Sequence, residues 1–344
     1  MASRRAPRMQ SSPGFMIFML NSRIALPIPV YASFWSGLMV AYPSKIVSPI
    51  MKNVMRLLVA AALAAVAFEF RADSSSPVQT DASRPSQTGY TLKRITLRSV
   101  HHRQAAMPRL RIKESTSGNW SGYAVPLETS GVTDTFSNVQ GSWAIPTVTG
   151  AKRTDTYLAT WVGIDGYTDG TVEQIGSEQD WVGSGQQNYV WFEMYPSDSY
   201  EIVGFPANPG DKITAQVHYV GQTSVSEGRG KSVEESVFQL TIENTTKNVS
   251  FTVPASYTTV ATAARGSAEW IAEAPSSRQV LPVSDFGSVI FSNCSATSTR
   301  SGGLAEPISF WPYDPITLVD GSSGDATPSA LTASGTAFSV SYSP

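Results

Sequence analysis

The chain has 344 residues, enough for one large β domain or two ordinary domains, and it carries 25 Lys and Arg against 27 Asp and Glu. Its charges are unevenly placed: residues 1–114 hold 16 basic and 4 acidic side chains, whereas residues 115–344 hold 9 and 23. A body this acidic has no basic stripe for phosphate groups, which argues against a nucleic-acid partner. The only cysteine is Cys294, so no intramolecular disulfide can form, and the compartment has to be inferred from the N-terminus.

A secretory signal is predicted inside the chain rather than at its start. Residues 24–44 lack charge, but prolines interrupt them and make a poor membrane helix. At Met51 a basic start is followed by an apolar run over 57–67 that ends in the small-residue pattern Ala65-Val66-Ala67. We interpret residues 51–72 as a signal peptide of a secreted protein that meets the membrane only for export. Residues 1–50 are then an extension from a misassigned start, and a membrane anchor is the alternative.

Residues 73–115 form a basic segment with little periodicity. Between Asp73 and Glu114 there are 8 Lys and Arg against 3 Asp and Glu. Such a segment is typical of a disordered linker or, next to an acidic body, of a basic propeptide that covers an acidic cleft. We expect the propeptide, which makes the chain's own pro-segment its inhibitor, with a boundary near Ser115 to Trp120.

Residues 116–344 are predicted to form one all-β domain. Short segments with alternating apolar and polar residues follow one another, separated by turn residues, and no long helical period appears. This pattern predicts an antiparallel β-sandwich of two sheets.

Several kinds of catalytic site are excluded by the residues that this domain lacks. Its only histidine is His218, expected on a strand surface, and Cys294 lies in an apolar run and is expected to be buried. The domain contains no HExxH zinc motif, no GxSxG elbow, no Asp-Thr-Gly and no phosphate loop. Carboxylate and amide chemistry remains, without a metal or a cofactor.

Two stretches supply candidates for that chemistry. In a strand, Trp191, Glu193 and Tyr195 share one face, which places a carboxylate between two rings. In the stretch SAEWIAEAP, Glu269 and Glu273 share a face and Trp270 points the other way. Carboxyl groups beside large apolar side chains acquire the raised pKa that acid–base catalysis uses. For each motif alone, core packing or a solvated strand end is the alternative.

Taken in order, the motifs GNWSGYAV, GSWAIP, WVGIDG, EQIG, WFEMYP and AEWIAE resemble the glutamic peptidase family, also called eqolisins. The resemblance spans about Asn119 to Pro275 and implies a concanavalin-like sandwich with a glutamine and a glutamate on one concave face. Carried over by motif, the catalytic residues are Gln174 and Glu273. The matching cleft and substrate-binding residues are Trp120, Trp161, Asp165, Trp191, Glu193 and Glu269. One departure is that known fungal members carry disulfides, which suggests a divergent branch.

The mechanism that the resemblance implies has no covalent intermediate. Glu273 takes a proton from a water that attacks the scissile carbonyl, and Gln174 donates to the oxyanion. The expected substrates are proteins and peptides, with an acidic optimum and a pKa of Glu273 raised by desolvation and by Asp165 and Glu193. The expected enzyme is a pepstatin-insensitive monomer.

Two alternatives use the same sandwich. The first is a glycoside hydrolase that pairs Glu273 with Glu193 or Asp165. The second is a glycan-binding, lectin-like module whose acidic residues hold Ca²⁺. Four Asn-x-Ser/Thr acceptors, at Asn119, Asn244, Asn248 and Asn293, are glycosylation sites only in a host that glycosylates.

Overall fold

The computed structural model describes residues 89–95, 115–127 and 134–344, apart from 168, 229, 278 and 320–323, and all of these belong to the unit Asp81–Pro344. The predicted extension 1–50 and signal peptide 51–72 lie outside the described residues. In the described part, the first nine strands are β1 (Thr91–Arg94), β2 (Ser115–Ser117), β3 (Trp120–Pro126), β4 (Phe136–Ala144), β5 (Ala159–Ile164), β6 (Val172–Val182), β7 (Gly185–Tyr195), β8 (Tyr200–Val203) and β9 (Lys212–Gly228). They are followed by β10 (Lys231–Asn244), β11 (Val249–Thr252), β12 (Thr259–Ala261), β13 (Ser267–Glu273), β14 (Ser288–Ser298), β15 (Glu306–Pro307), β16 (Asp314–Val319), β17 (Asp325–Pro328) and β18 (Phe338–Ser343), with two short 3-10 helices, η1 (Ala255–Tyr257) and η2 (Ile308–Phe310).

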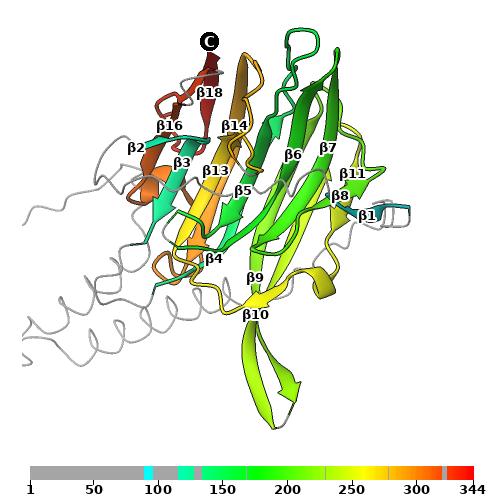
Figure 1. Cartoon of the computed structure of the whole chain (residues 1–344). Coiled ribbons are helices and arrows are strands. Elements are labelled where there is room, and N and C mark those ends of the chain that lie inside the picture. Colours follow the sequence, from blue (N-terminus) through cyan, green and yellow to red (C-terminus); the bar gives the residue numbers. More distant parts are fainter. Residues whose placement is uncertain are drawn as a thin grey trace, which may run out of the picture. The chain divides into compact units, whose positions relative to one another are not determined.

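By their pairing, most of these strands fall into two runs, which we call the first and second layers. The first layer runs β1, β8, β7, β6, β5, β13, β3, β16 by antiparallel pairing, with β2 added parallel to β16. The second layer runs β18, β14, β4, β9, β10, and the far end of its β9–β10 hairpin extends beyond the other strands (Figure 1). Strand β17 pairs with both β16 and β18, so the pairings of the described strands form one continuous network. The predicted all-β, antiparallel architecture is confirmed.

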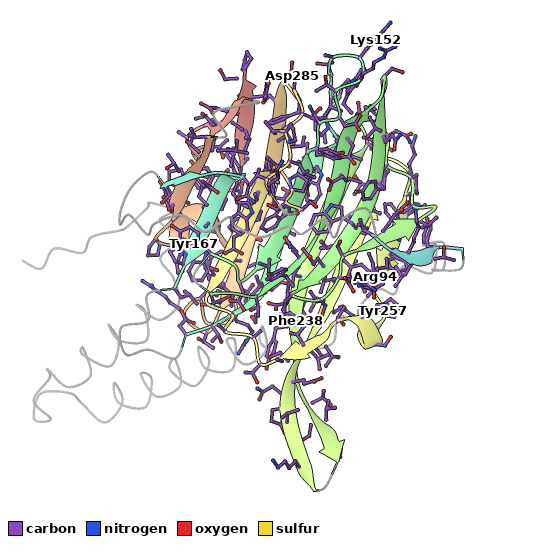
Figure 2. The ribbon with its side chains drawn as sticks, viewed as in Figure 1. Arg94, Lys152, Tyr167, Phe238, Tyr257 and Asp285 are labelled. Carbon is purple, nitrogen blue, oxygen red and sulfur yellow. The ribbon has the colours of Figure 1, made fainter. Side chains whose placement is uncertain are left out.

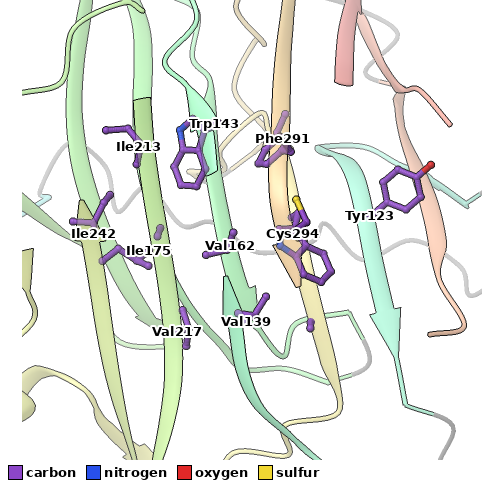
Figure 3. Packing of buried hydrophobic residues seen from close by; sticks show 14 of the residues in the cluster. Tyr123, Val139, Trp143, Val162, Ile175, Ile213, Val217, Ile242, Phe291 and Cys294 are labelled. Atoms are coloured by element: carbon purple, nitrogen blue, oxygen red, sulfur yellow. The ribbon is translucent and has the colours of Figure 1, made fainter. Parts of the chain in front are cut away.

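Strand alternation explains which side chains fill the space between the layers. On β9, Ile213, Ala215 and Val217 are buried, and the residues between them are more exposed. The same period on β13 sends Trp270 into this core, and Trp270 therefore points away from Glu269 and Glu273, as the sequence predicted. Figure 3 shows part of the core, including Trp143 and Cys294.

Two tryptophans fix the layers to each other through hydrogen bonds as well as by packing. The indole of Trp270 on β13 donates to the carbonyl of Gln140 on β4 over 2.7 Å. The indole of Trp143 on β4 donates to Ser177 Oγ on β6 over 2.9 Å. A buried indole N–H without a partner would cost free energy, so both bonds also favour one orientation of the layers.

Strand β1 lies inside the segment 73–115 that the sequence assigns to a basic propeptide or linker. It pairs with β8 and so forms one end of the first layer. Among the described residues, no helix is long and apolar enough to cross a membrane.

Candidate active site

The first layer has a second face, turned away from the core, and we call it the site face. Its apolar residues form a cluster of their own that includes Trp120, Trp161, Trp191 and Ile271. Residues that face one another across paired strands point to the same side of a sheet, so the register defines the rest of this face. In the strand order β3, β13, β5, β6, β7, its three rows are Trp120, Glu273, Ala159, Glu178 and Tyr189; Gly122, Ile271, Trp161, Gly176 and Trp191; and Ala124, Glu269, Gly163, Gln174 and Glu193.

Both predicted catalytic residues lie on the site face, on opposite sides of one tryptophan. Glu273 is in the first row on β13, Trp161 in the second on β5, and Gln174 in the third on β6. All three side chains are fully buried. The register therefore arranges a carboxyl group, an indole and a carboxamide along a diagonal of the sheet.

Hydrogen bonds from neighbouring side chains hold the carboxyl group of Glu273. The indole Nε1 of Trp161 donates to Oε2 over 2.8 Å, and Nδ2 of Asn119 donates to Oε1 over 2.9 Å. Burial raises the pKa of Glu273 well above its usual range, the bond from Trp161 opposes this rise, and the charge of Glu193 adds to it. The direction is the predicted one. Asp165, also expected to contribute, acts instead on the pKa of Glu173 and Glu269.

The carboxamide of Gln174 is oriented by its neighbour in the same row. Its Nε2 donates to Oε2 of Glu193 on β7 over 2.9 Å. Because a carboxylate oxygen can only accept, this bond identifies the nitrogen side of the amide and directs it along the site face.

Two glycines make room for the Trp161 ring. A Cβ at Gly176 would lie 2.5 Å from Trp161 Cβ, and a Cβ at Gly163 would lie 2.9 Å from the ring carbon Cζ3. The Gly163 position also adjoins Gln174 Cβ, at 3.3 Å. Trp120 then closes against the other side of Trp161 in an edge-to-face contact with ring centroids 4.9 Å apart.

Asp165, the first residue after β5, holds the segment that leads into β13. Its backbone has φ 69°, and its two carboxylate oxygens accept the N–H groups of Arg265 and Gly266 over 2.7 and 2.6 Å. Burial and the charge of Asp169 raise its pKa to about 7, although the two backbone donors oppose the rise. These contacts position the start of β13 and hence Glu269 and Glu273.

Sequence reasoning missed two groups at this site. Asn119, considered only as a glycosylation acceptor, is fully buried and bonded to Glu273. Glu178 and Asp180 continue the two-residue period from Gln174 along β6, and that period was the available signal. Burial raises the pKa of Glu178, and the charges of Asp180 and Glu273 add to the rise. Burial likewise raises the pKa of Asp180, to about 8.

The histidine and the cysteine that the sequence analysis excluded as catalytic residues lie where it predicted. His218 is exposed on β9, with Nδ1 3.1 Å from the carbonyl of Ser137. Cys294 is fully buried, and burial raises the pKa of its thiol.

An acid-rich, tryptophan-lined face on an antiparallel β-fold, with a glutamine and a glutamate around one indole, is the arrangement expected for a glutamic peptidase. The sequence model of the Peptidase A4 family matches residues 118–342. Aspergillopepsin-2 of Aspergillus niger is 30% identical over 209 residues, which are 55% of this chain and 67% of that protein. The crystal structure of scytalido-glutamic peptidase with a transition state analog inhibitor matches with a TM-score of 0.50 and 25% identity, over 66% of this chain and 98% of that one.

The chain belongs to the Peptidase A4 family. It is a glutamic endopeptidase, and the predicted resemblance to the eqolisins is confirmed. This assignment replaces the alternatives of a glycoside hydrolase and a glycan-binding module.

Proposed function

We propose that the chain is a secreted acid endopeptidase in which Gln174 and Glu273 hydrolyse peptide bonds with an activated water, without a metal or cofactor. The observation that carries this proposal is the placement of Glu273. Its carboxyl group is held by Trp161 and Asn119 on the same buried face as Gln174.

Glu273 acts first as a base and then as an acid. Its carboxylate form takes a proton from water as the water attacks the scissile carbonyl, and the protonated form passes that proton to the leaving nitrogen. The donors Trp161 and Asn119 favour the carboxylate form, whereas burial and Glu193 favour the protonated form. Because these effects oppose each other, the carboxyl group of Glu273 can act as the base in the first step and as the acid in the second.

Gln174 stabilises the oxyanion that forms from the scissile carbonyl. The bond to Glu193 orients its amide, and donation from Nε2 to the developing oxyanion is an interaction typically worth ~3 kcal/mol in the transition state. In this proposal the substrate chain packs against Trp120, Trp161 and Trp191, which are buried in the full chain and have to become accessible for binding. In this proposal Glu193 and Glu269 border the cleft, while Asp165 contributes through the loop that it holds.

The site favours acidic conditions because carboxyl groups crowd it. Burial raises the pKa of Glu178, Glu269 and Glu273 together. As the pH rises, these groups become buried like charges, which oppose the closed packing of the site face. We therefore expect an acidic optimum.

Export and maturation complete the proposal. The signal peptide that begins at Met51 directs secretion, the basic segment 73–115 is an inhibitory propeptide, and the mature enzyme is a monomer. The charge contrast between residues 1–114 and 115–344 supports the pairing of a basic pro-segment with an acidic body.

The test is proteolysis of a denatured protein by the chain from Met51 onward, acidified to about pH 3.5, below the reference pKa of Glu, and then assayed from that pH up to pH 8, so that both the acid and the base form of Glu273 are sampled. Glu273→Gln and Gln174→Ala should each fold and lose nearly all turnover. The matched controls Glu234→Gln and Gln222→Ala are exposed on the β9–β10 hairpin and should retain it. Parent activity should resist pepstatin and chelator. Full turnover in either site variant, or loss with chelator, would contradict the proposal.

A further inference from the structure

The segment Gly89–Ile95 binds the edge of the first layer as an added strand. Thr91 to Arg94 pair in antiparallel register with Val203 to Tyr200, and the next residue continues the ladder, with Ile95 N–H donating to the Ser199 carbonyl over 3.0 Å. Adding a strand to an exposed sheet edge is a general way in which proteins bind extended peptides, because the backbone bonds fit any sequence.

Side chains at both ends of the segment give this binding its specificity. The Tyr90 ring packs against Phe205 and Phe251, with centroids 5.4 and 5.9 Å away. At the other end, Lys93 pairs with Glu201 over 3.3 Å, and Arg94 pairs with Asp198 over 2.6 Å. Figure 2 shows Arg94 at this edge.

The two kinds of contact differ in what they contribute. Both basic side chains are more than half exposed, at 68% and 58%, so their ion pairs fix the register more than they add affinity. The aromatic contact of Tyr90 and the backbone ladder hold the strand.

The last residue of the segment reaches the site face. Ile95 packs against the apolar cluster that contains Trp120, Trp161 and Trp191. The bound strand is also close to that cluster through the sheet, because β8 is the only strand between β1 and β7, and Glu201 on β8 faces Trp191.

We propose that residues 89–95 are an inhibitory strand: the β8 edge binds this extended Tyr-x-x-basic-basic-apolar peptide, and the docked strand lowers peptidase activity by holding Ile95 on the site face. The proposal rests on the proposed function of that face. It identifies the binding site of the pro-segment as a sheet edge beside the site face, whereas the sequence suggested only that basic residues cover acidic ones.

A disulfide that locks the strand tests this directly. Lys93 and Glu201 face each other across β1 and β8, where Cα atoms are within disulfide range, and the native Cys294 is buried. The double variant Lys93→Cys, Glu201→Cys should form the bond in the full chain from Met51 onward. After acidification, reduction should raise its activity about tenfold or more, because the lock keeps the strand at a high effective concentration. Each single variant should respond to reductant as the parent does.

The outcomes of this experiment test the docking of β1 on β8 separately from the proposed peptidase activity. Failure of the disulfide to form contradicts the β1–β8 placement. A locked chain as active as its reduced form overturns the inhibitory role and leaves β1 as a structural edge. Inactivity of the parent, of both single variants and of the reduced double variant refutes the proposed function instead, while disulfide formation still reports the docking.

A second measurement uses the segment in trans. The synthetic peptide of residues 89–95 should inhibit the processed enzyme, and replacing its Tyr90 by Ala should weaken inhibition about tenfold, whereas replacing the exposed Thr91 by Ala should not. Equal inhibition by the Tyr90→Ala and parent peptides would contradict the assigned anchor. No inhibition by the parent peptide would contradict the inhibitory strand.

Discussion

The indole of Trp161 donates a hydrogen bond to the carboxyl group of Glu273, 2.8 Å away on the neighbouring strand, and at the same time separates Glu273 from Gln174. This contact favours the ionised form of Glu273. One side chain therefore both separates the two proposed catalytic residues and affects the pKa of the acidic one.

Trp161→Phe should lower kcat/KM by about 10- to 100-fold, because a hydrogen bond to a charged group contributes roughly 1.5–3 kcal/mol. The sign of the pH effect follows from the contact. Removing a donor to the carboxylate raises the pKa of Glu273 further, so the acidic limb of the pH–kcat/KM profile should move to higher pH. A profile with an unchanged acidic limb would show that the bond does not control the ionisation that matters.

Gly163→Ala should damage the site more than the fold. The added methyl group would meet Trp161 Cζ3 at 2.9 Å and Gln174 Cβ at 3.3 Å, so one of these side chains has to move. A misplacement of this size can cost on the order of 100-fold in turnover. Gly185→Ala is the matched control, because its added Cβ meets nothing within 4 Å. Steady-state rates and melting temperatures of both variants test this, and normal turnover in Gly163→Ala would argue against a tightly fixed Trp161.

The protein should be most stable in acid. Burial raises the pKa of Asp165 to about 7 and that of Asp180 to about 8, whereas an unfolded Asp has a pKa of about 3.9. A carboxyl group with a raised folded pKa contributes full stability below its unfolded pKa and loses it as the pH rises to the folded value. The melting temperature should therefore fall by several degrees per group between about pH 4 and pH 8.

Melting curves in a Glu273→Gln background, which prevents self-digestion, provide the measurement. Asp180→Asn should flatten the fall between pH 4 and 8. Asp211 gives a control of opposite sign: burial opposes the change, but hydrogen bonds from Asn244 and Asn208 lower its pKa. Asp211→Asn should therefore cost stability at neutral pH. A melting temperature that rises from pH 4 to 8 would be inconsistent with the crowded carboxyl groups.

Glycosylation should occur only at the acceptor asparagines that are exposed. Asn119 and Asn244 are fully buried, and both donate through Nδ2, to Glu273 and to Asp211. Asn248 and Asn293 are exposed. Protein secreted by a glycosylating host should carry glycans only at the exposed pair in its active fraction, as peptide mass spectrometry can determine. A glycan on Asn119 in active enzyme would disprove the bond to Glu273.

The sequence by itself determined which residues share a face within each strand. The two-residue period placed Glu269 with Glu273 and Trp191 with Glu193, and it placed Trp270 on the opposite face of its strand, because side-chain alternation depends only on local backbone geometry. The order of motifs then identified the family and the candidate pair Gln174 and Glu273.

Tertiary structure alone decided how those faces meet. Strand β13 lies between β3 and β5, although about 100 residues of chain separate it from β5, and this pairing brings Trp161 and Asn119 to Glu273. It also turns Asp165 toward the amides of Arg265 and Gly266, and it pairs β1 with β8. Register between distant strands is set by the packing of the whole core, and no local period encodes it.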